Sequence, residues 1–378
     1  MRIGLLLPNS NFITRLAADI RRWLVLGLEE NGSAGELFIE ACGYNEKAST
    51  LREKLQHLVM RDDVDLIVAP LNPGMVSHIA DLLPGQQTPL VTLTMGEDVV
   101  EGDTAPPWLF VNSFGLWRSA WLNGWHAVHT HGPKICTMSA AHEGGYGLAF
   151  AAALGVEAAG GEIAAALPLP MQFTADHVAA HMSVAIEVAA NAIILLASGE
   201  AQDAVSAALA GPGGNPGAIA ITGFAPHAWL PGGRRPDAGA PASALFSSWD
   251  PGAPSSAAFI DRFVADNNSP AHAYALMAYE AGGLIAAALS GGQGPMQGEG
   301  LCQALAAATF DGPRGPASFD PQTQEINQPQ HLLESRDGGA LVVCKGDTPE
   351  IPELLAEQVA LARQKVGKSG WLNPYLVA

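Results

Sequence analysis

The sequence predicts an α/β protein with two parallel sheets, each built from alternating strands and helices. Three observations support this prediction. Apolar runs alternate with helical periodicity from the first residues, a strand–helix–strand unit spans residues 63–96, and the same alternation starts again after residue 112. A length of 378 residues fits two domains, so we expect one sheet in each half of the chain.

The first half of the chain predicts a doubly wound sheet. Continuous apolar runs, as expected for strands buried on both faces, mark strands at residues 3–8, 37–41, 66–68, 89–93 and 108–111. Apolar side chains at helical spacing over residues 16–27 and 51–59 predict helices between the first of these strands.

Residues 63–96 predict a parallel βαβ unit. The strand Leu66–Val68 leads to Asn72-Pro73, which we interpret as a helix N-cap followed by proline at the first helical position. One face of the expected helix carries Val76, Ile79, Ala80 and Leu83. Because ligands of open α/β sheets bind beyond the carboxyl ends of the strands, we expect residues 72–75 and 94–97 at a binding edge. A purely structural role as cap and strand end is the alternative.

The second half predicts another α/β sheet. A helix over residues 115–129 precedes strands at 135–138, 163–167, 193–197 and 219–222. The segments 211–217 and 226–241 are rich in glycine and proline, which is typical of surface loops. A strand at 245–248 and helices at 256–266 and 271–289 follow.

Composition excludes several classes of protein. Hydrophobic residues make up 48% of the chain and charged residues 15%, which is typical of a globular protein. The formal net charge of −18 and the lack of a basic stripe exclude a nucleic-acid partner. The longest apolar stretches, 189–197 and 284–289, are shorter than the ~20 residues that span a bilayer.

The cysteines and the start of the chain bear on its compartment. Four isolated cysteines, without a paired motif, predict buried thiols rather than a metal site: Cys42, Cys136, Cys302 and Cys344. The opening Met1–Gly4 has no signal-peptide pattern. We therefore expect either a cytoplasmic protein or one from which a leader was removed.

The last part of the chain carries a set of motifs in a fixed order. They are Phe310–Pro313, Gly315, Phe319-Asp320, Gln328-Pro329 and Gly338-Gly339. Together with Leu28–Asn31, Val68–Leu71 and Tyr146-Gly147, they make the chain resemble the type I periplasmic binding proteins, specifically the branched-chain amino-acid receptor family of ABC importers. The resemblance covers residues 1–345.

This resemblance implies two Rossmann-like lobes joined by three hinge crossings, with the ligand enclosed between the lobes. Lobe one would comprise residues 1–113 and 250–327, and lobe two residues 114–249 and 328–350. The hinges would lie near residues 112–115, 247–251 and 326–330. Residues 351–378 would form a C-terminal helical extension. A ligand would then stabilise the closed lobes by contacting both.

The chain departs from the family at the expected ligand site. Asn72-Pro73-Gly74 stands where amino-acid-binding members have hydroxylated residues, and Thr94-Met95 adds a bulky thioether. Trp117 stands where an acidic residue is frequent, whereas Tyr146 is retained. Binding an ammonium group requires a buried carboxylate, and binding a carboxylate requires several donors. These departures argue against a zwitterionic amino acid as the ligand.

Aromatic and sulfur-containing side chains favour a small ligand that is apolar or aromatic, with or without a carboxylate. We expect Trp117 at the ligand, while packing of the helix on its sheet is the favoured role of Trp121 and Trp125. The predicted ligand-binding residues are Asn72, Gly74, Thr94, Met95, Trp117, Tyr146, Ser198, Phe224, Trp249 and Tyr274.

The sequence leaves three functions to compare, and an enzyme is the least favoured of them. The favoured one is a solute receptor, expected to be a monomer, that delivers its ligand to an ABC permease and works in the periplasm once a leader is removed. A cytoplasmic ligand sensor on the same fold is the alternative. We predict no enzyme, cofactor or metal site, since no catalytic triad, Walker motif or acid–base pair is evident and His126, His129 and His131 fit a solvated helix end.

Overall fold

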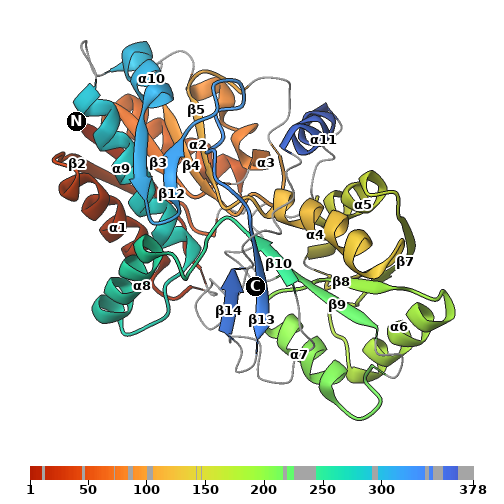
Figure 1. The fold of residues 1–378 in the computed structure, drawn as a ribbon. Helices are drawn as coiled ribbons and strands as arrows, with labels where there is room; N and C mark the ends of the chain where they lie inside the picture. The colour runs from red at the N-terminus through yellow and green to blue at the C-terminus, as the bar shows by residue number, and fades with distance from the viewer. Residues whose placement is uncertain are drawn as a thin grey trace. The chain divides into compact units, whose positions relative to one another are not determined.

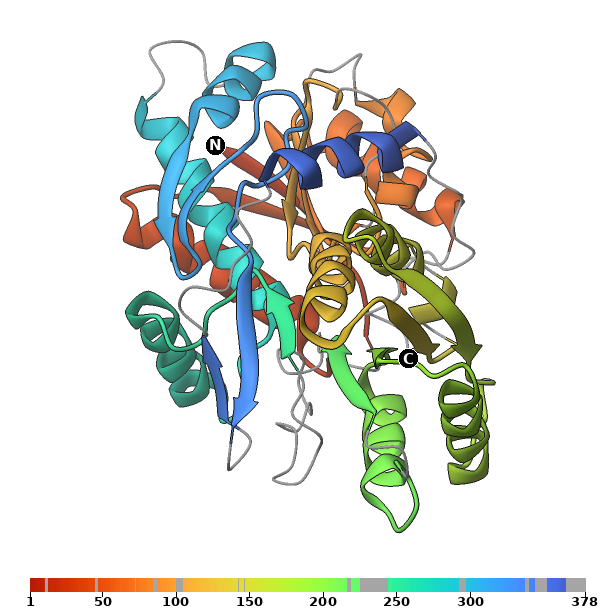
Figure 2. The same ribbon diagram turned by 45° about the vertical axis from the view of Figure 1, so that its right-hand side comes forward.

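The computed structural model, drawn in Figures 1 and 2, describes most of the chain. The described residues are 1–10, 13–44, 47–71, 73–83, 88–99, 105–141, 143–145, 147–215, 219–224, 244–291, 297–336, 340–343 and 352–364.

The chain forms two compact units. Unit 1 comprises Met1–Phe114, Ala253–Pro329 and Ala362–Ala378, and unit 2 comprises Gly115–Gly252 and Gln330–Leu361. Each unit contains its own parallel sheet. The predicted α/β class with two such sheets is confirmed.

The sheet of unit 1 has five parallel strands in the order β2-β1-β3-β4-β5. The strands lie where the apolar runs predict them, with ends shifted by one or two residues: β1 (Arg2–Leu7), β2 (Glu36–Ala41), β3 (Leu66–Ala69), β4 (Leu90–Thr94) and β5 (Leu109–Ser113). Thr94 pairs with Ser113, so β4 and β5 end side by side at the carboxyl edge of the sheet.

Unit 1 contains helices that cover both faces of this sheet and helices that pack on those helices (Figure 1). They are α1 (Leu16–Glu30), α2 (Ala48–Gln56) with a π-helical turn (His57–Arg61), α3 (Pro73–Val76), α8 (Pro254–Asn267), α9 (Ala273–Gly291) and α10 (Gly298–Ala307). Helices α1 and α9 pack closely because glycines face each other where they cross. A Cβ atom on Gly27 would overlap the carbonyl oxygen of Tyr279, and one on Gly282 would overlap that of Leu24.

The helix predicted over residues 73–83 is interrupted, which corrects the sequence-based interpretation. Helix α3 ends at Val76, and a separate 3₁₀ turn spans Ala80–Leu82. The Ser77 hydroxyl donates a hydrogen bond to the Gly74 carbonyl at 2.8 Å, a local bond that competes with helical continuation. Val76, Ile79 and Leu83 are nevertheless buried, so the apolar spacing identifies the inner face correctly.

The sheet of unit 2 has four parallel strands in the order β7-β6-β8-β9. They are β6 (Lys134–Ser139), β7 (Glu162–Pro168), β8 (Ala192–Leu196) and β9 (Ala220–Phe224). The helices of this unit are α4 (Leu116–His131), α5 (Leu148–Ala158), α6 (Ala175–Glu187) and α7 (Gly199–Ala210). Helices α4 and α5 also cross at glycines, since a Cβ atom on Gly155 would overlap the Trp121 carbonyl oxygen and one on Gly124 that of Ala152.

Antiparallel strands and a last helix complete the two units. Unit 2 includes a three-stranded sheet of β10 (Ala244–Ser247), β13 (His331–Arg336) and β14 (Ala340–Val343). Unit 1 includes the hairpin β11 (Thr309–Gly312) and β12 (Gly315–Ser318). Helix α11 (Pro352–Gln364) lies in the predicted extension, and its Arg363 pairs with Glu325 at 3.7 Å.

Helix α9 is, among the described helices, the one long and apolar enough to cross a membrane. Within the structure 78% of its most apolar window is buried. Its packing in the core of unit 1, against α1, α10 and the sheet, accounts for this composition.

Candidate functional site

The carboxyl end of β4 in unit 1 brings three polar groups together. The Thr94 hydroxyl donates to Glu97 Oε2 at 3.3 Å and accepts a hydrogen bond from the Gly96 N–H at 3.2 Å. Gly96 has a φ of 72°, which lets the chain turn back on itself at this point. Thr94, Met95 and Glu97 are all buried. The turn thus holds a carboxylate and a thioether at the binding edge predicted from the sequence.

Tyr274, in the first turn of α9, belongs to the same region of unit 1. Its side chain is buried, and burial raises the pKa of its phenol well above the ordinary value, with the negative charge of Glu97 adding to the effect. Tyr274 therefore stays protonated and can donate a hydrogen bond at any physiological pH. Thr94, Met95 and Tyr274 are the predicted site residues that unit 1 gathers.

Two further predictions concern the start of α3. Gly74 is exposed in this four-residue helix, and Asn72 lies outside the described residues. Because α3 has only four residues, its dipole contributes little positive potential at the carboxyl edge of the sheet.

Trp117 lies at the start of α4 in unit 2, with only 3% of its surface exposed. Gly115 precedes the helix with a φ of 79°, a conformation that favours glycine. One turn into the helix, the Ser119 hydroxyl donates to Gln330 Oε1 at 2.8 Å. This hydrogen bond joins the first turns of α4, which carry Trp117, to Gln330, where the chain re-enters unit 2.

The other tryptophans of unit 2 differ in their surroundings. Trp121 is fully buried against the α5 crossing, and Trp125 stacks on His129 with ring centres 3.8 Å apart. Trp249 is fully buried too, and its N–H donates to the Ser247 hydroxyl at 3.1 Å. Its role as a ligand contact stays a prediction.

Ser198 and Glu143 meet at the carboxyl edge of the second sheet. Glu143 lies in a short 3₁₀ turn that follows β6, and Ser198 follows the neighbouring β8 and precedes α7. The Ser198 hydroxyl donates a hydrogen bond to Glu143 Oε1 instead of capping α7. Burial raises the pKa of Glu143 to about 7, against the opposing effects of the Ser198 hydroxyl and the residue's own N–H.

Glu97 and Glu143 are absent from the predicted ligand-binding residues, although Glu97 belongs to a segment expected at the binding edge. Glu97 stands two residues after Met95, within the segment 94–97 that the sequence predicts at the binding edge. Glu143 gives a weaker signal, an acidic residue in a glycine-bearing loop after a buried strand. The structure thus contains two buried carboxyl groups, of Glu97 and Glu143, beyond the predicted ligand-binding residues.

For two further predicted residues, Tyr146 and Phe224, the structure describes no side chain. Tyr146 lies outside the described residues. Phe224 is the last residue of β9, at the same carboxyl edge as Ser198, and only its backbone is described. Both stay predictions.

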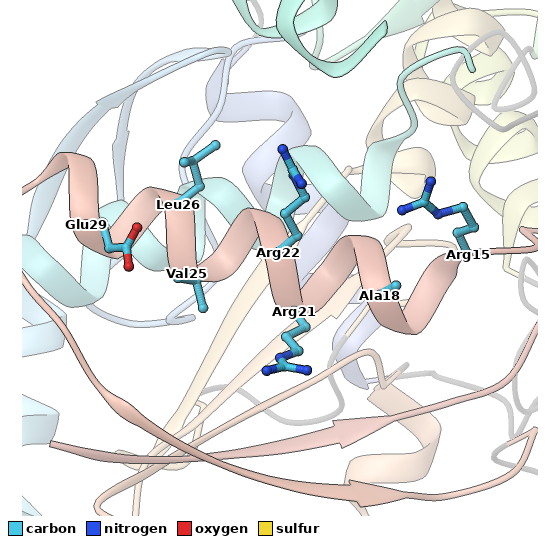
Figure 3. Close-up of a pocket in the computed structure, with 7 residues that line it drawn as sticks. All are labelled: Arg15, Ala18, Arg21, Arg22, Val25, Leu26 and Glu29. Carbon is cyan, nitrogen blue, oxygen red and sulfur yellow. The ribbon is translucent and has the colours of Figure 1, made fainter. Parts of the chain in front are cut away.

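Two hollows in unit 1 lie apart from these edges. One, of about 450 Å³, runs along the exposed side of α1 and carries Arg15, Arg21 and Arg22. Figure 3 shows Arg22 and Leu26 projecting to one side of the helix and Arg21 and Val25 to the other, so these side chains do not converge on a ligand. The other, of about 290 Å³, has an aromatic floor of Trp23, Phe259 and Tyr279.

The polar groups of this second hollow already bond to one another. Arg262 and the Tyr279 hydroxyl both donate to the Glu30 carboxylate, the latter at 2.8 Å. Neither hollow matches the predicted ligand site.

The histidines of α4 and the described cysteines have local roles. His129 Nδ1 donates to the Trp125 carbonyl at 2.9 Å, and His126 packs edge-on against Phe246. Across the described parts of the chain, no three His, Cys, Asp or Glu side chains are grouped to hold a metal ion. Cys42, Cys136 and Cys302 are free buried thiols, and Cys344 lies outside the described residues.

Comparison with known proteins places this architecture in a family. The model of the periplasmic binding protein family matches residues 2–340. None of the curated proteins compared matches the chain significantly.

Solved structures share the fold at low sequence identity. An ABC transporter substrate-binding protein from Sphaerobacter thermophilus is 22% identical with a TM-score of 0.70, and the match covers 91% of this chain and 96% of that one. A solute-binding protein from R. palustris in complex with benzoate is 19% identical with a TM-score of 0.69, covering 90% and 94%.

An amino-acid ABC transporter substrate-binding protein from Pseudomonas fluorescens Pf-5 is 13% identical with a TM-score of 0.67, covering 91% and 94%. The family match spans most of the sequence and agrees with the two parallel sheets. The chain therefore belongs to the type I periplasmic binding protein family.

Proposed function

We propose that the chain is the substrate-binding protein of an ABC importer and that it binds a small organic ligand with an apolar or aromatic body. The family match over residues 2–340 is the observation that carries this proposal. Proteins of similar fold include substrate-binding proteins of ABC transporters. The ligand would bind by closure of the two lobes about residues 112–115, 247–251 and 326–330.

The aromatic character of the ligand is supported by the side chains at the two sheet edges. Met95 follows β4, and Trp117 begins α4. A thioether and an indole offer polarisable surfaces that suit a flat apolar guest. The R. palustris protein of similar fold binds benzoate, which is an aromatic ligand of this kind.

A pair of tryptophan variants tests the proposed site. Replacing Trp117 by Leu should weaken the binding of an aromatic acid by about tenfold or more, because a buried ring contact contributes on the order of 1 kcal/mol beyond its area. Replacing Trp125 by Leu is the matched control, since this residue lies two turns along the same helix and stacks on His129. Equal losses in both variants would remove Trp117 from the site.

Closure can be measured on the unmodified protein. Small-angle scattering should show a smaller radius of gyration when 4-hydroxybenzoate is added at saturation. A bound ligand with an unchanged radius would contradict binding by hinge closure.

The proposed partner is an ABC permease, and the proposed compartment is the periplasm. Expression from the complete natural gene, followed by cell fractionation, tests the compartment. Recovery in the cytoplasmic fraction alone would contradict it.

A further inference from the structure

We propose that Glu143 binds a hydrogen-bond donor of the ligand, either a hydroxyl or an ammonium group, and so selects ligands that carry one. This inference rests on the proposed function, because it names the polar group of the same ligand. It adds a recognition residue that is not among the predicted ligand-binding residues.

The first step of the argument is the state of the Glu143 carboxyl group. The side chain is fully buried, and its Oε1 accepts the hydrogen bond from Ser198. Its Oε2 is also buried and has no hydrogen-bond partner among the described residues. A buried acceptor left without a donor is unfavourable, and more so when it is charged. A ligand that supplies the donor recovers this energy.

The second step is the position of this oxygen. Glu143 follows β6 and Ser198 follows β8, and these strands are neighbours in the parallel sheet of unit 2. Both residues therefore lie at the carboxyl edge, where ligands of open α/β sheets bind. Glu143 Oε2, which has no partner within the described part of the chain, thus belongs to the edge of unit 2 where we expect the ligand.

A second acceptor lies close by along the chain. Gln202 follows Ser198 by one helical turn, and its N–H donates to the Ser198 carbonyl at 3.4 Å. Its Oε1 is buried and likewise has no partner among the described residues. Glu143 and Gln202 both bond to Ser198, and each has a buried oxygen that can accept a hydrogen bond. These two acceptors favour a ligand with several hydrogen-bond donors at this edge.

A comparison with Glu280 shows that this fold can satisfy a buried glutamate when its role is structural. Arg314 donates to both oxygens of Glu280, at 3.0 Å from Nε and 2.6 Å from Nη2. Glu143 has a hydroxyl in place of a guanidinium. Its raised pKa, about 7, fits a carboxyl group that a donating ligand would shift toward the ionised form.

The test uses two pairs of probes and the intact chain. In the first pair, 4-hydroxybenzoate has a donor and 4-methoxybenzoate lacks it. In the second, benzylamine has an ammonium group and benzoate lacks it. Affinities are measured by calorimetry for the wild type and for Glu143→Gln, which keeps the size of the side chain and removes its charge. Glu157→Gln is the matched control, because it makes the same substitution at an exposed position of α5.

The expected result is a preference of about tenfold or more for the donor in at least one pair, falling to about threefold or less in Glu143→Gln. A preference in the first pair would identify the donor as a hydroxyl, and a preference in the second pair would identify it as an ammonium group. Equal binding within both pairs, or a preference that Glu143→Gln leaves unchanged, would overturn the inference and leave the proposed function standing. Failure of all four probes to bind the wild type would contradict the aromatic ligand class and, with it, the inference.

A measurement on the wild type alone provides a second test, independent of whether Glu143→Gln folds. Calorimetry in buffers of different ionisation enthalpy counts the protons exchanged on binding. At pH 7 the preferred donor probe should release about half a proton, because the free carboxyl, with a pKa of about 7, is half protonated. Proton uptake would mean that Glu143 donates to the ligand and would overturn the inference.

Discussion

The guanidinium of Arg314 lies 2.6 Å from the carboxylate of Glu280, and both side chains are fully buried in unit 1. Arg314 also donates to the Ser113 carbonyl and to Asn112 Oδ1, each at 2.8 Å. One side chain therefore ties the β11–β12 turn to α9 and to the end of β5. The last residues of β5 lead into the first predicted hinge, so this network holds one end of that hinge in place.

Removing one member of this ion pair should destabilise unit 1 strongly. We expect Glu280→Gln to lower the free energy of unfolding by about 3–5 kcal/mol, because it leaves a buried guanidinium without its counter-charge. Chemical denaturation measures the change. Asp266→Asn is the control, since its pair with Arg22 is also 2.6 Å long but exposed and should cost less than about 1 kcal/mol. Equal effects of the two variants would show that the buried pair is not structural.

The glycine contact between α4 and α5 should tolerate no side chain. Gly155→Ala would force a methyl group into the Trp121 carbonyl oxygen, and we expect a loss of at least about 2 kcal/mol in stability. Gly291→Ala, at the end of α9 with open space around it, is the matched control and should be neutral or slightly stabilising. A melting temperature for Gly155→Ala at or above that of the wild type would contradict this packing.

The stability of the protein should depend on pH through Glu143. Its pKa is about 7 in the folded chain, against an ordinary value of 4.5, so between these values the folded state holds a proton that the unfolded state has released. The free energy of unfolding therefore falls as pH rises from about 4.5 to about 7, by on the order of 3 kcal/mol.

Glu143→Gln cannot ionise and should lack this part of the pH dependence. Denaturation of both proteins at several pH values gives the difference between their free energies of unfolding, which should change most between pH 4.5 and 7 and stay constant above about 8. Parallel curves over the whole range would mean that Glu143 titrates normally in the folded protein.

Much of the fold could be predicted because its signals are local. Runs such as Leu66–Val68 are apolar without interruption, since parallel strands are buried on both faces. The helix expected over residues 73–83 failed at Ser77, whose hydroxyl bonds to Gly74. The sequence shows that a serine stands there, but its choice between solvent and backbone depends on the folded surroundings.

The buried carboxyl group of Glu143 could not be predicted in the same way. Ser198 and Glu143 are 55 residues apart and meet because β6 and β8 are neighbours in the sheet, with β7 on the other side of β6. Burial of an acidic side chain depends on such pairings, which no local pattern reveals. For this reason Ser198 was predicted as a site residue and its partner was not.

The most direct test of the proposed function is calorimetric titration of the wild-type protein with 4-hydroxybenzoate and with leucine. We expect 4-hydroxybenzoate to bind at one site with a Kd of ~1 μM or below, which corresponds to about −8 kcal/mol, and leucine to bind at least about a hundredfold more weakly. Tight binding of leucine, with no binding of 4-hydroxybenzoate, would contradict the account.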